Sequence, residues 1–138
     1  MNQMLTKPHI LVVDDDESMR FMLQTKLFQS GFNVSLAASG SHAIQIFQSG
    51  KRFDLIICDL KMPLKTGIDV LKFLKETHVE TPIILLTGFP EREKIIAAAQ
   101  MGVQDVLVKP VRHSDLMAMI KSKLEVGEKP DEAHRQAS

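Results

Sequence analysis

Five short apolar runs, rich in β-branched residues, recur along the chain and constrain its fold more than any other feature. They span residues 10–13, 34–37, 55–58, 83–86 and 106–108. Short continuous apolar runs of this kind are typical of strands that are buried on both faces. We therefore expect five strands, each covered on both sides.

Between these runs, apolar residues recur at the spacing of one face of a helix. They are Met19, Met22, Leu23 and Leu27; Ala43, Ile46 and Phe47; Val70, Leu71 and Leu74; Ile95, Ala98 and Ala99; and Leu116, Met119, Ile120 and Leu124. Glycines follow the first, second and fourth of these segments, at Gly31, Gly50 and Gly102. Thr66 with Asp69 resembles a capping box ahead of the third segment. Pro90 with Glu91 opens the fourth.

Strand and helix therefore alternate five times. Such βα units place neighbouring strands parallel and connect them by right-handed crossovers. The predicted fold class is α/β: a (βα)5 doubly wound, open parallel sheet with helices on both faces. In sheets of this kind, functional residues lie at the carboxyl ends of the strands.

The length and the distribution of apolar residues predict a single domain. The chain has 138 residues, which is an ordinary length for one domain. We expect the folded domain to cover residues 5–126. Residues 127–138 have almost nothing to bury, so we expect them to form a mobile polar tail or the stub of a linker.

Charge and cysteine content limit the partners and the compartment. The 17 basic and 17 acidic side chains balance, which disfavours direct binding of nucleic acid or a membrane surface by this segment. The longest apolar stretches are far short of the ~20 residues that span a bilayer, and the polar start has no apolar export segment. The single cysteine, Cys58, allows no internal disulfide. We therefore expect a cytoplasmic protein.

Acidic residues follow two of the predicted strands. Asp14 and Asp15 come directly after the first strand, and Asp59 comes directly after the third. Asp16 and Glu17 are more simply a helix cap and a first-turn charge. Two unit charges ~4 Å apart repel by about 4 kcal/mol at an effective dielectric of 20, so three converging carboxylates require a compensating cation. Mg²⁺ suits a few carboxylates together with water and a phosphate oxygen.

Two further side chains stand at strand ends: Thr87 after the fourth strand and Lys109 after the fifth. Taken singly, each has an ordinary structural explanation: Thr87 as a β-branched residue at the end of a strand, and Lys109 as an amphipathic lysine at the surface. Together with the acids, Lys109 gives a site whose charges cancel, because three carboxylates, one Mg²⁺ and one lysine sum to zero charge. A phosphoryl group on Asp59 would replace the carboxylate charge by about −2, and Lys109, the metal and the Thr87 hydroxyl are available to stabilise it.

Four segments carry a resemblance to a known family. They read Val-Val-Asp14-Asp15-Asp16, Ile-Cys-Asp59-Leu-Lys-Met-Pro63, Leu-Leu-Thr87-Gly88 and Val-Lys109-Pro110. In order and spacing they resemble the signature segments of the two-component response-regulator receiver domain, in its chemotaxis-regulator-like form. The resemblance implies a flavodoxin-like fold with strand order 2-1-3-4-5.

The resemblance also implies roles for the matching acidic residues. Asp59 would accept a phosphoryl group from a histidine of a sensor kinase or of a histidine phosphotransfer protein. Asp15, Asp59 and the main-chain carbonyl of Lys61 would bind Mg²⁺, for which Mn²⁺ can substitute. Asp14 would act on the metal largely through water.

Further roles follow from the same resemblance. Thr87 would be the switch hydroxyl, and Lys109 would grip the phosphoryl group. Pro110 would follow a cis peptide bond. Gly67 and Pro63 match a glycine and a proline that the family places after the third strand.

Two features depart from the usual family pattern. Val106 stands three residues before Lys109, where many receivers have an aromatic switch residue, and a valine cannot swing as an aromatic ring does. We therefore expect a switch loop around Gly88 and Phe89 to carry the change instead. Lys61 and Phe89 occupy positions that modulate acyl-phosphate hydrolysis in this family.

Several alternatives stay open at this point. The chain is either a stand-alone receiver or the N-terminal receiver of a longer regulator such as a transcription factor. A flavin-binding protein of the same fold is disfavoured, because the acidic loop after the first strand would repel a phosphate-bearing cofactor. A phosphatase with Asp59 as nucleophile would turn over small substrates, whereas a receiver is no enzyme in that sense and catalyses only its own phosphorylation and dephosphorylation.

Overall fold

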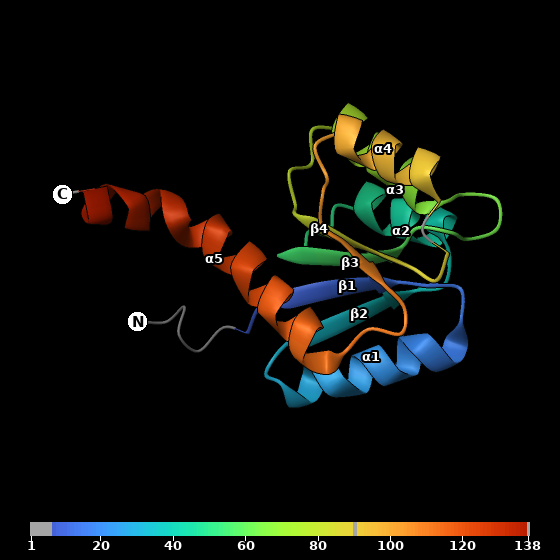
Figure 1. Ribbon diagram of the computed structural model, residues 1–138, viewed down its shortest axis with the longest axis horizontal. Coiled ribbons are helices and arrows are strands. Elements are labelled where there is room, and N and C mark those ends of the chain that lie inside the picture. The colour runs from blue at the N-terminus through green and yellow to red at the C-terminus, as the bar shows by residue number, and fades with distance from the viewer. Residues whose placement is uncertain (1–6, 90, 138) are drawn as a thin grey trace.

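Strands and helices alternate along the chain (Figure 1). The structure, a computed structural model, describes residues 7–89 and 91–137, with side chains through Glu125. The strands are β1 (His9–Val13), β2 (Asn33–Ala37), β3 (Leu55–Asp59), β4 (Ile83–Thr87) and β5 (Val106–Val108). The helices are α1 (Glu17–Gln29), α2 (Gly40–Gln48), α3 (Gly67–Glu76), α4 (Arg92–Gln100) and α5 (His113–Ala137).

The strands form one parallel sheet in the order β2-β1-β3-β4-β5. α1 and α5 cover one face of this sheet, and α2, α3 and α4 cover the other (Figure 1). The core is split accordingly: Leu27 and Ile120 pack on the first face, and Phe47, Val70 and Ala98 pack on the second. This arrangement confirms the predicted doubly wound sheet and the strand order that the resemblance implies.

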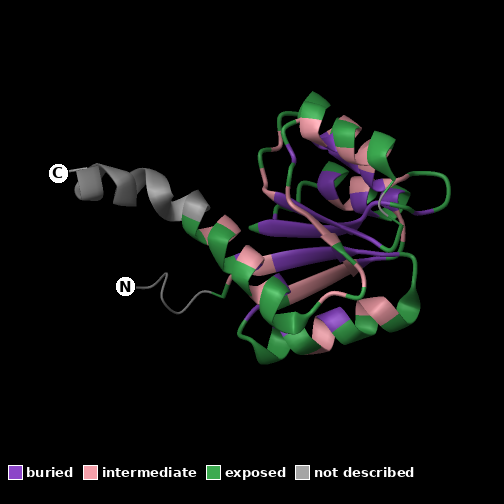
Figure 2. Ribbon diagram, in the orientation of Figure 1, coloured by how far each residue is buried: buried purple, intermediate pink, exposed green. Residues whose placement is uncertain are grey.

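Burial differs between the central and the edge strands. Every residue of β3 and β4 is buried, as is all of β1 except His9. In β2 only Ala37 is buried, and in β5 Val108 is exposed. The expectation that every strand is buried on both faces is therefore wrong for β2 and β5. Each of them lies at an edge of the sheet, where the helices cover it incompletely (Figure 2).

Most of the predicted helix boundaries are confirmed. Asp16 caps α1 by accepting hydrogen bonds from two first-turn amides. Thr66 forms a capping box with Asp69 at the start of α3. The glycines that follow α1, α2 and α4 all have positive φ: Gly31, Gly50 and Gly102. α4 begins at Arg92, and the expected opening residue, Pro90, lies outside the described residues.

α5 projects away from the sheet (Figure 1). Its first turns pack Leu116 and Ile120 against the core, and its backbone continues as a helix to Ala137. The predicted domain end after residue 126 and the expected tail fall where side chains are not described, so the boundary stays a prediction. None of the described helices combines the length and the apolar character that a membrane crossing requires.

Gly67 begins α3 and lies against the end of β3. A Cβ atom at this position would lie 2.8 Å from the carbonyl oxygen of Asp59 and 2.9 Å from the Cα atom of Leu60. The Gly67 amide also donates a hydrogen bond to the Leu60 carbonyl, over 3.0 Å. A glycine therefore allows an approach between helix and strand that a side chain would prevent.

We expect Gly67→Ala to lower the free energy of unfolding by about 1–3 kcal/mol, because the added methyl group pushes α3 away from β3. Gly88→Ala is the matched control, since a Cβ atom there would meet nothing within 4 Å. Its stability should be unchanged or slightly raised. Equilibrium urea unfolding measures both variants. Equal stabilities would contradict the close approach.

Candidate functional site

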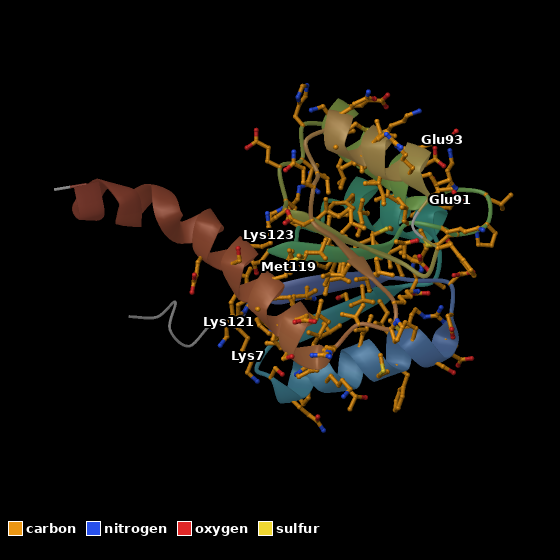
Figure 3. The ribbon with its side chains drawn as sticks, viewed as in Figure 1. Lys7, Glu91, Glu93, Met119, Lys121 and Lys123 are labelled. Carbon is orange, nitrogen blue, oxygen red and sulfur yellow. The ribbon has the colours of Figure 1, made fainter. Side chains whose placement is uncertain are left out.

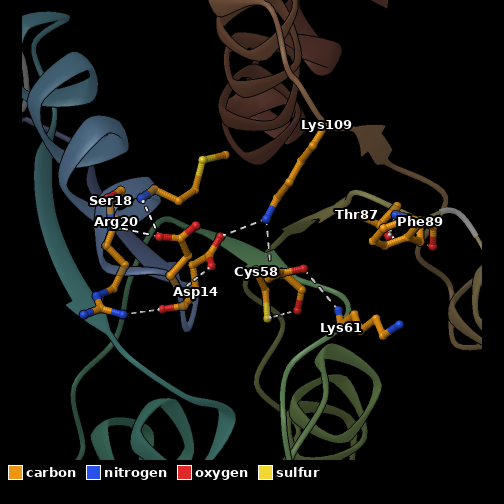
Figure 4. A network of polar contacts seen from close by, with 11 residues as sticks. Asp14, Ser18, Arg20, Cys58, Lys61, Thr87, Phe89 and Lys109 are labelled. Atoms are coloured by element: carbon orange, nitrogen blue, oxygen red, sulfur yellow. Dashed lines mark hydrogen bonds and ion pairs between the residues drawn. The ribbon is translucent and has the colours of Figure 1, made fainter.

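The parallel register brings the residues at three strand ends to one edge of the sheet. β1 and β3 pair through Val13 and Cys58, so the residues that follow them, Asp14 and Asp59, stand side by side. β4 lies on the other side of β3 and ends at Thr87. Asp14, Asp59 and Thr87 therefore lie at the same edge of the sheet, and Lys109 follows β5 at this edge (Figure 4).

Asp14, Asp15 and Asp59 form an acidic cluster. One carboxylate oxygen from each lies within 4.8 Å of the others. Asp14 is 1% exposed and Asp59 is 6% exposed, whereas Asp15 is open to solvent. Burial raises the pKa of Asp14 above its ordinary value, because the loss of hydration outweighs the hydrogen bond from the Asp16 amide and the charge of Lys109.

Hydrogen bonds to the backbone hold the two buried carboxylates in place. The Asp16 amide donates to Asp14 Oδ1 over 2.9 Å, and the Lys61 amide donates to Asp59 Oδ1 over 3.1 Å. The guanidinium of Arg20 donates to the main-chain carbonyl of Asp14 over 2.8 Å. α1 and the loop after β3 are thereby both fastened to the cluster.

Lys109 bridges the two buried carboxylates (Figure 4). Its Nζ atom lies 3.2 Å from Asp14 Oδ2 and 3.1 Å from Asp59 Oδ2. Its amide donates to the Thr87 carbonyl over 2.8 Å, which fixes the end of β5 against β4. Partial burial lowers the pKa of Lys109, but the charges of Asp14 and Asp59 outweigh that effect. The pKa is therefore raised, and the lysine stays charged at neutral pH.

The Thr87 side chain is fully buried and is engaged with the loop that follows β4. Its hydroxyl donates to the Phe89 carbonyl over 3.0 Å and accepts from the Phe89 amide over 3.2 Å. The Phe89 ring is 70% exposed, and the Lys61 ammonium lies 5.3 Å from its centroid. The predicted switch loop, Gly88 and Phe89, is thus tied to the strand end through this hydroxyl.

Three other predicted features are present. Val106 begins the edge strand β5 and is half-buried. The Lys109–Pro110 peptide bond is cis. Cys58 is fully buried beside the predicted acceptor, and its thiol donates to the Asp59 carbonyl over 3.4 Å. Burial, assisted by the nearby acidic charges, raises the pKa of this thiol.

Arg20 is a site residue that the sequence reasoning missed. It lies four residues after the Asp16 cap, and helical side chains lean toward the helix N-terminus, so this spacing was the available signal. For Lys61, the structure shows the main-chain amide on Asp59, and the proposed metal contact of its carbonyl stays a prediction. The structure brings the predicted residues together, while their chemical roles remain predictions.

The contribution of the Lys109 charge to stability can be tested by substitution. Lys109→Met leaves two buried carboxylates without this cation, so we expect the metal-free protein to lose about 1–3 kcal/mol of unfolding free energy. Asp14→Asn relieves the repulsion and should therefore be more favourable in the Lys109→Met background than in the wild type. Urea unfolding of the four proteins with a chelator measures this coupling. Strictly additive effects would show that the side chains act independently.

Comparisons with known proteins identify the family of this chain. The sequence matches the response regulator receiver domain family over residues 10–121. It is 37% identical over 113 residues to the transcriptional regulatory protein CpxR of Escherichia coli (strain K12), which covers 82% of this chain and 47% of CpxR. It is 38% identical over 115 residues to protein PetR of Rhodobacter capsulatus, which covers 83% of this chain and 48% of PetR. The chain thus spans about half the length of these relatives.

Solved structures show the same fold. Chemotaxis protein CheY4 of Vibrio cholerae matches with a TM-score of 0.78 and 33% identity, over 86% of this chain and 100% of that protein. A CheY-like receiver domain protein from Methanospirillum hungatei JF-1 matches with a TM-score of 0.85 and 27% identity, over 91% of this chain and 99% of that one. With its family matched over nearly the whole described fold, the chain belongs to the response regulator receiver domains of two-component systems.

Proposed function

We propose that Asp59 of this receiver accepts a phosphoryl group from a phosphohistidine of a sensor kinase or of a histidine phosphotransfer protein. The resulting acyl phosphate would switch contacts with a downstream protein. The Lys109 bridge is the observation that supports this most strongly, since it holds a cation 3.1 Å from the recessed Asp59 carboxylate. A charged stabiliser is therefore in place before the phosphoryl group arrives.

In the proposed transfer, a carboxylate oxygen of Asp59 attacks phosphorus. The phosphorus–nitrogen bond to histidine breaks, and the imidazole leaves with the electron pair. Because the new group carries about −2 charge, Lys109 can keep one hydrogen bond to it while remaining near Asp14. The Thr87 hydroxyl can donate to a phosphoryl oxygen only by giving up its hydrogen bond to the Phe89 carbonyl.

The acidic cluster fits Mg²⁺, with Mn²⁺ as a substitute. Asp14, Asp15 and Asp59 offer carboxylate oxygens within 4.8 Å of one another, and hard divalent cations prefer such oxygen ligands. Asp15, Asp59 and the main-chain carbonyl of Lys61 would hold the ion, with Asp14 acting largely through water. When bound, the metal neutralises developing charge on the phosphoryl oxygens.

The wider role is proposed from the relatives. CpxR is a transcriptional regulatory protein, and the matched segment covers 47% of it. We propose that residues 5–126 are the receiver of a regulator of this kind and carry out only their own phosphorylation and dephosphorylation. The zero net charge disfavours direct DNA binding by this segment, so we propose that it regulates through protein contacts. We propose a cytoplasmic location from the family alone.

Asp59→Asn should abolish acid-labile labelling by a small acyl phosphate such as acetyl phosphate, because the amide cannot form the acyl phosphate. Asp16→Asn is the matched control: this residue caps α1, asparagine also caps helices, and labelling should persist. Labelling is measured by intact mass after a brief reaction. One phosphoryl group per chain is expected, whereas undiminished labelling of Asp59→Asn would refute the assignment.

Mg²⁺ should raise the melting temperature of the wild-type protein by mass action. Asp15→Asn should weaken that effect and should itself stabilise the metal-free protein, because it removes one of three mutually repelling charges. Asp16→Asn, outside the cluster, should retain the full response to Mg²⁺. Thermal melts with Mg²⁺ and with a chelator measure both effects. If neither Mg²⁺ nor Asp15→Asn changed the melting temperature, the proposed metal site would be contradicted.

Beryllofluoride, an unreactive phosphoryl mimic, should strongly perturb the amide resonances of residues 87–89 and 91–96. The reason is that the Thr87 hydroxyl must leave Phe89 to reach the mimic. The Val106 methyl rotamer should stay unchanged, because a β-branched side chain is stiff at χ1. Two-dimensional NMR with methyl labelling tests both. Unchanged amide resonances in the loop, together with a changed Val106 rotamer, would show that the switch lies in β5.

A further inference from the structure

α1 carries apolar side chains on two opposite sides. On its inward side, Leu23 and Leu27 are buried against the sheet. On its outward side, Phe21 is 68% exposed and Phe28 is 61% exposed. Figure 2 shows in green that much of α1 is exposed. Two such rings on one helix form an apolar surface that water solvates poorly.

Glu17, Phe21, Gln24 and Phe28 lie along one side of α1, because they are spaced by four, three and four residues. We call these four residues the Phe21 strip. A groove of about 480 Å³ lies beside its C-terminal half and is lined by Gln24, Thr25, Phe28, Gln29 and Val34. The strip therefore has a protruding aromatic ring near one end and a hollow at the other.

The two ends of the strip also carry opposite charges. Glu17 stands at the N-terminal end. At the C-terminal end, the ammonium of Lys7 lies 5.4 Å from the centroid of the Phe28 ring. The neighbouring Pro8 accepts a hydrogen bond from the Asn33 amide, which places Lys7 just beyond the last turn of α1 (Figure 3).

We infer that the Phe21 strip pairs with the same strip of a second copy of this chain, with the two α1 helices antiparallel about a two-fold axis near Gln24. Phe21 of each copy enters the groove beside Phe28 of the other, and Glu17 of each copy meets Lys7 of the other. The helix dipoles then also oppose each other favourably.

Self-complementarity is what selects a second copy as the occupant. A two-fold contact uses the same surface on both partners, so each half of the surface must fit the other half. The strip meets this condition twice, because its ring matches its groove and its acidic end matches its basic end. The strip is short, so the association belongs to the weak class of interfaces, with a Kd of roughly 0.1–1 mM.

Sedimentation equilibrium of the whole chain, from about 10 µM to about 1 mM, tests the pairing. We expect reversible dimers, and Phe21→Gln should weaken them about tenfold or more by removing both ring insertions. Ile96→Gln, at another exposed apolar side chain on α4, is the matched control and should leave the Kd unchanged. A chain that stays monomeric, or a control that weakens dimers as much as Phe21→Gln, overturns the proposal.

Exchanging charges tests the antiparallel arrangement independently. Glu17→Lys and Lys7→Glu each place like charges at both ends of the pair, so each variant alone should associate less than the wild type at low salt. An equal mixture of the two variants restores opposite charges at both ends and should recover dimers, as heterodimers. Failure of the mixture to recover dimers overturns the antiparallel pairing. Both positions are exposed, so we expect both variants to fold, and circular dichroism is the measurement that checks this.

Discussion

The pairing of one lysine with two buried carboxylates is the interaction on which the site depends. Parallel strands with apolar interiors bring whatever follows them to one edge, and here that is Asp14 and Asp59. Their mutual repulsion opposes folding, and Lys109 offsets it from β5, on the far side of β4. The charge-assisted hydrogen bonds of Lys109 therefore join chain segments from the centre and the edge of the sheet.

The Thr87 hydroxyl connects the end of β4 to the loop that follows it. A hydroxyl has one proton to donate, so the Thr87 side chain can serve the Phe89 carbonyl or another acceptor at one time. In the proposed phosphorylated state, the Phe89 carbonyl would compete with a phosphoryl oxygen for this proton. Such competition gives two discrete arrangements rather than a gradual change.

Much of this fold could be predicted from the sequence, because strands buried on both faces leave continuous apolar runs. The run at residues 55–58 predicts β3 to within one residue, and Asp59 joins the strand because backbone pairing ignores side-chain chemistry. The apolar pattern alone does not reveal which strands lie at the edges. The strand order that the resemblance implies does place β2 and β5 there, and their partial exposure follows from that order.

The cluster of acids, lysine and threonine was likewise predictable, because each follows a strand whose end the sequence marks. The hydrogen bonds that hold these side chains in place were harder to predict. Only its spacing after Asp16 pointed to Arg20, which binds a main-chain carbonyl. The bond from the Lys61 amide left no signal, because every residue except proline carries a backbone amide. The pairing of Thr87 with Phe89 depends on the path of a loop, which periodicity does not describe.

The buried thiol beside the acceptor has a consequence for chemical selectivity. A thiolate is a strong nucleophile and the form that oxidants attack, but Cys58 is fully enclosed and its raised pKa keeps the sulfur protonated. The Cys58 thiol therefore does not compete with Asp59 as a nucleophile in the folded domain, and it is shielded from oxidants in solution. Reaction of Cys58 with an alkylating reagent would instead require the sheet to open, which makes this side chain a built-in reporter of transient unfolding.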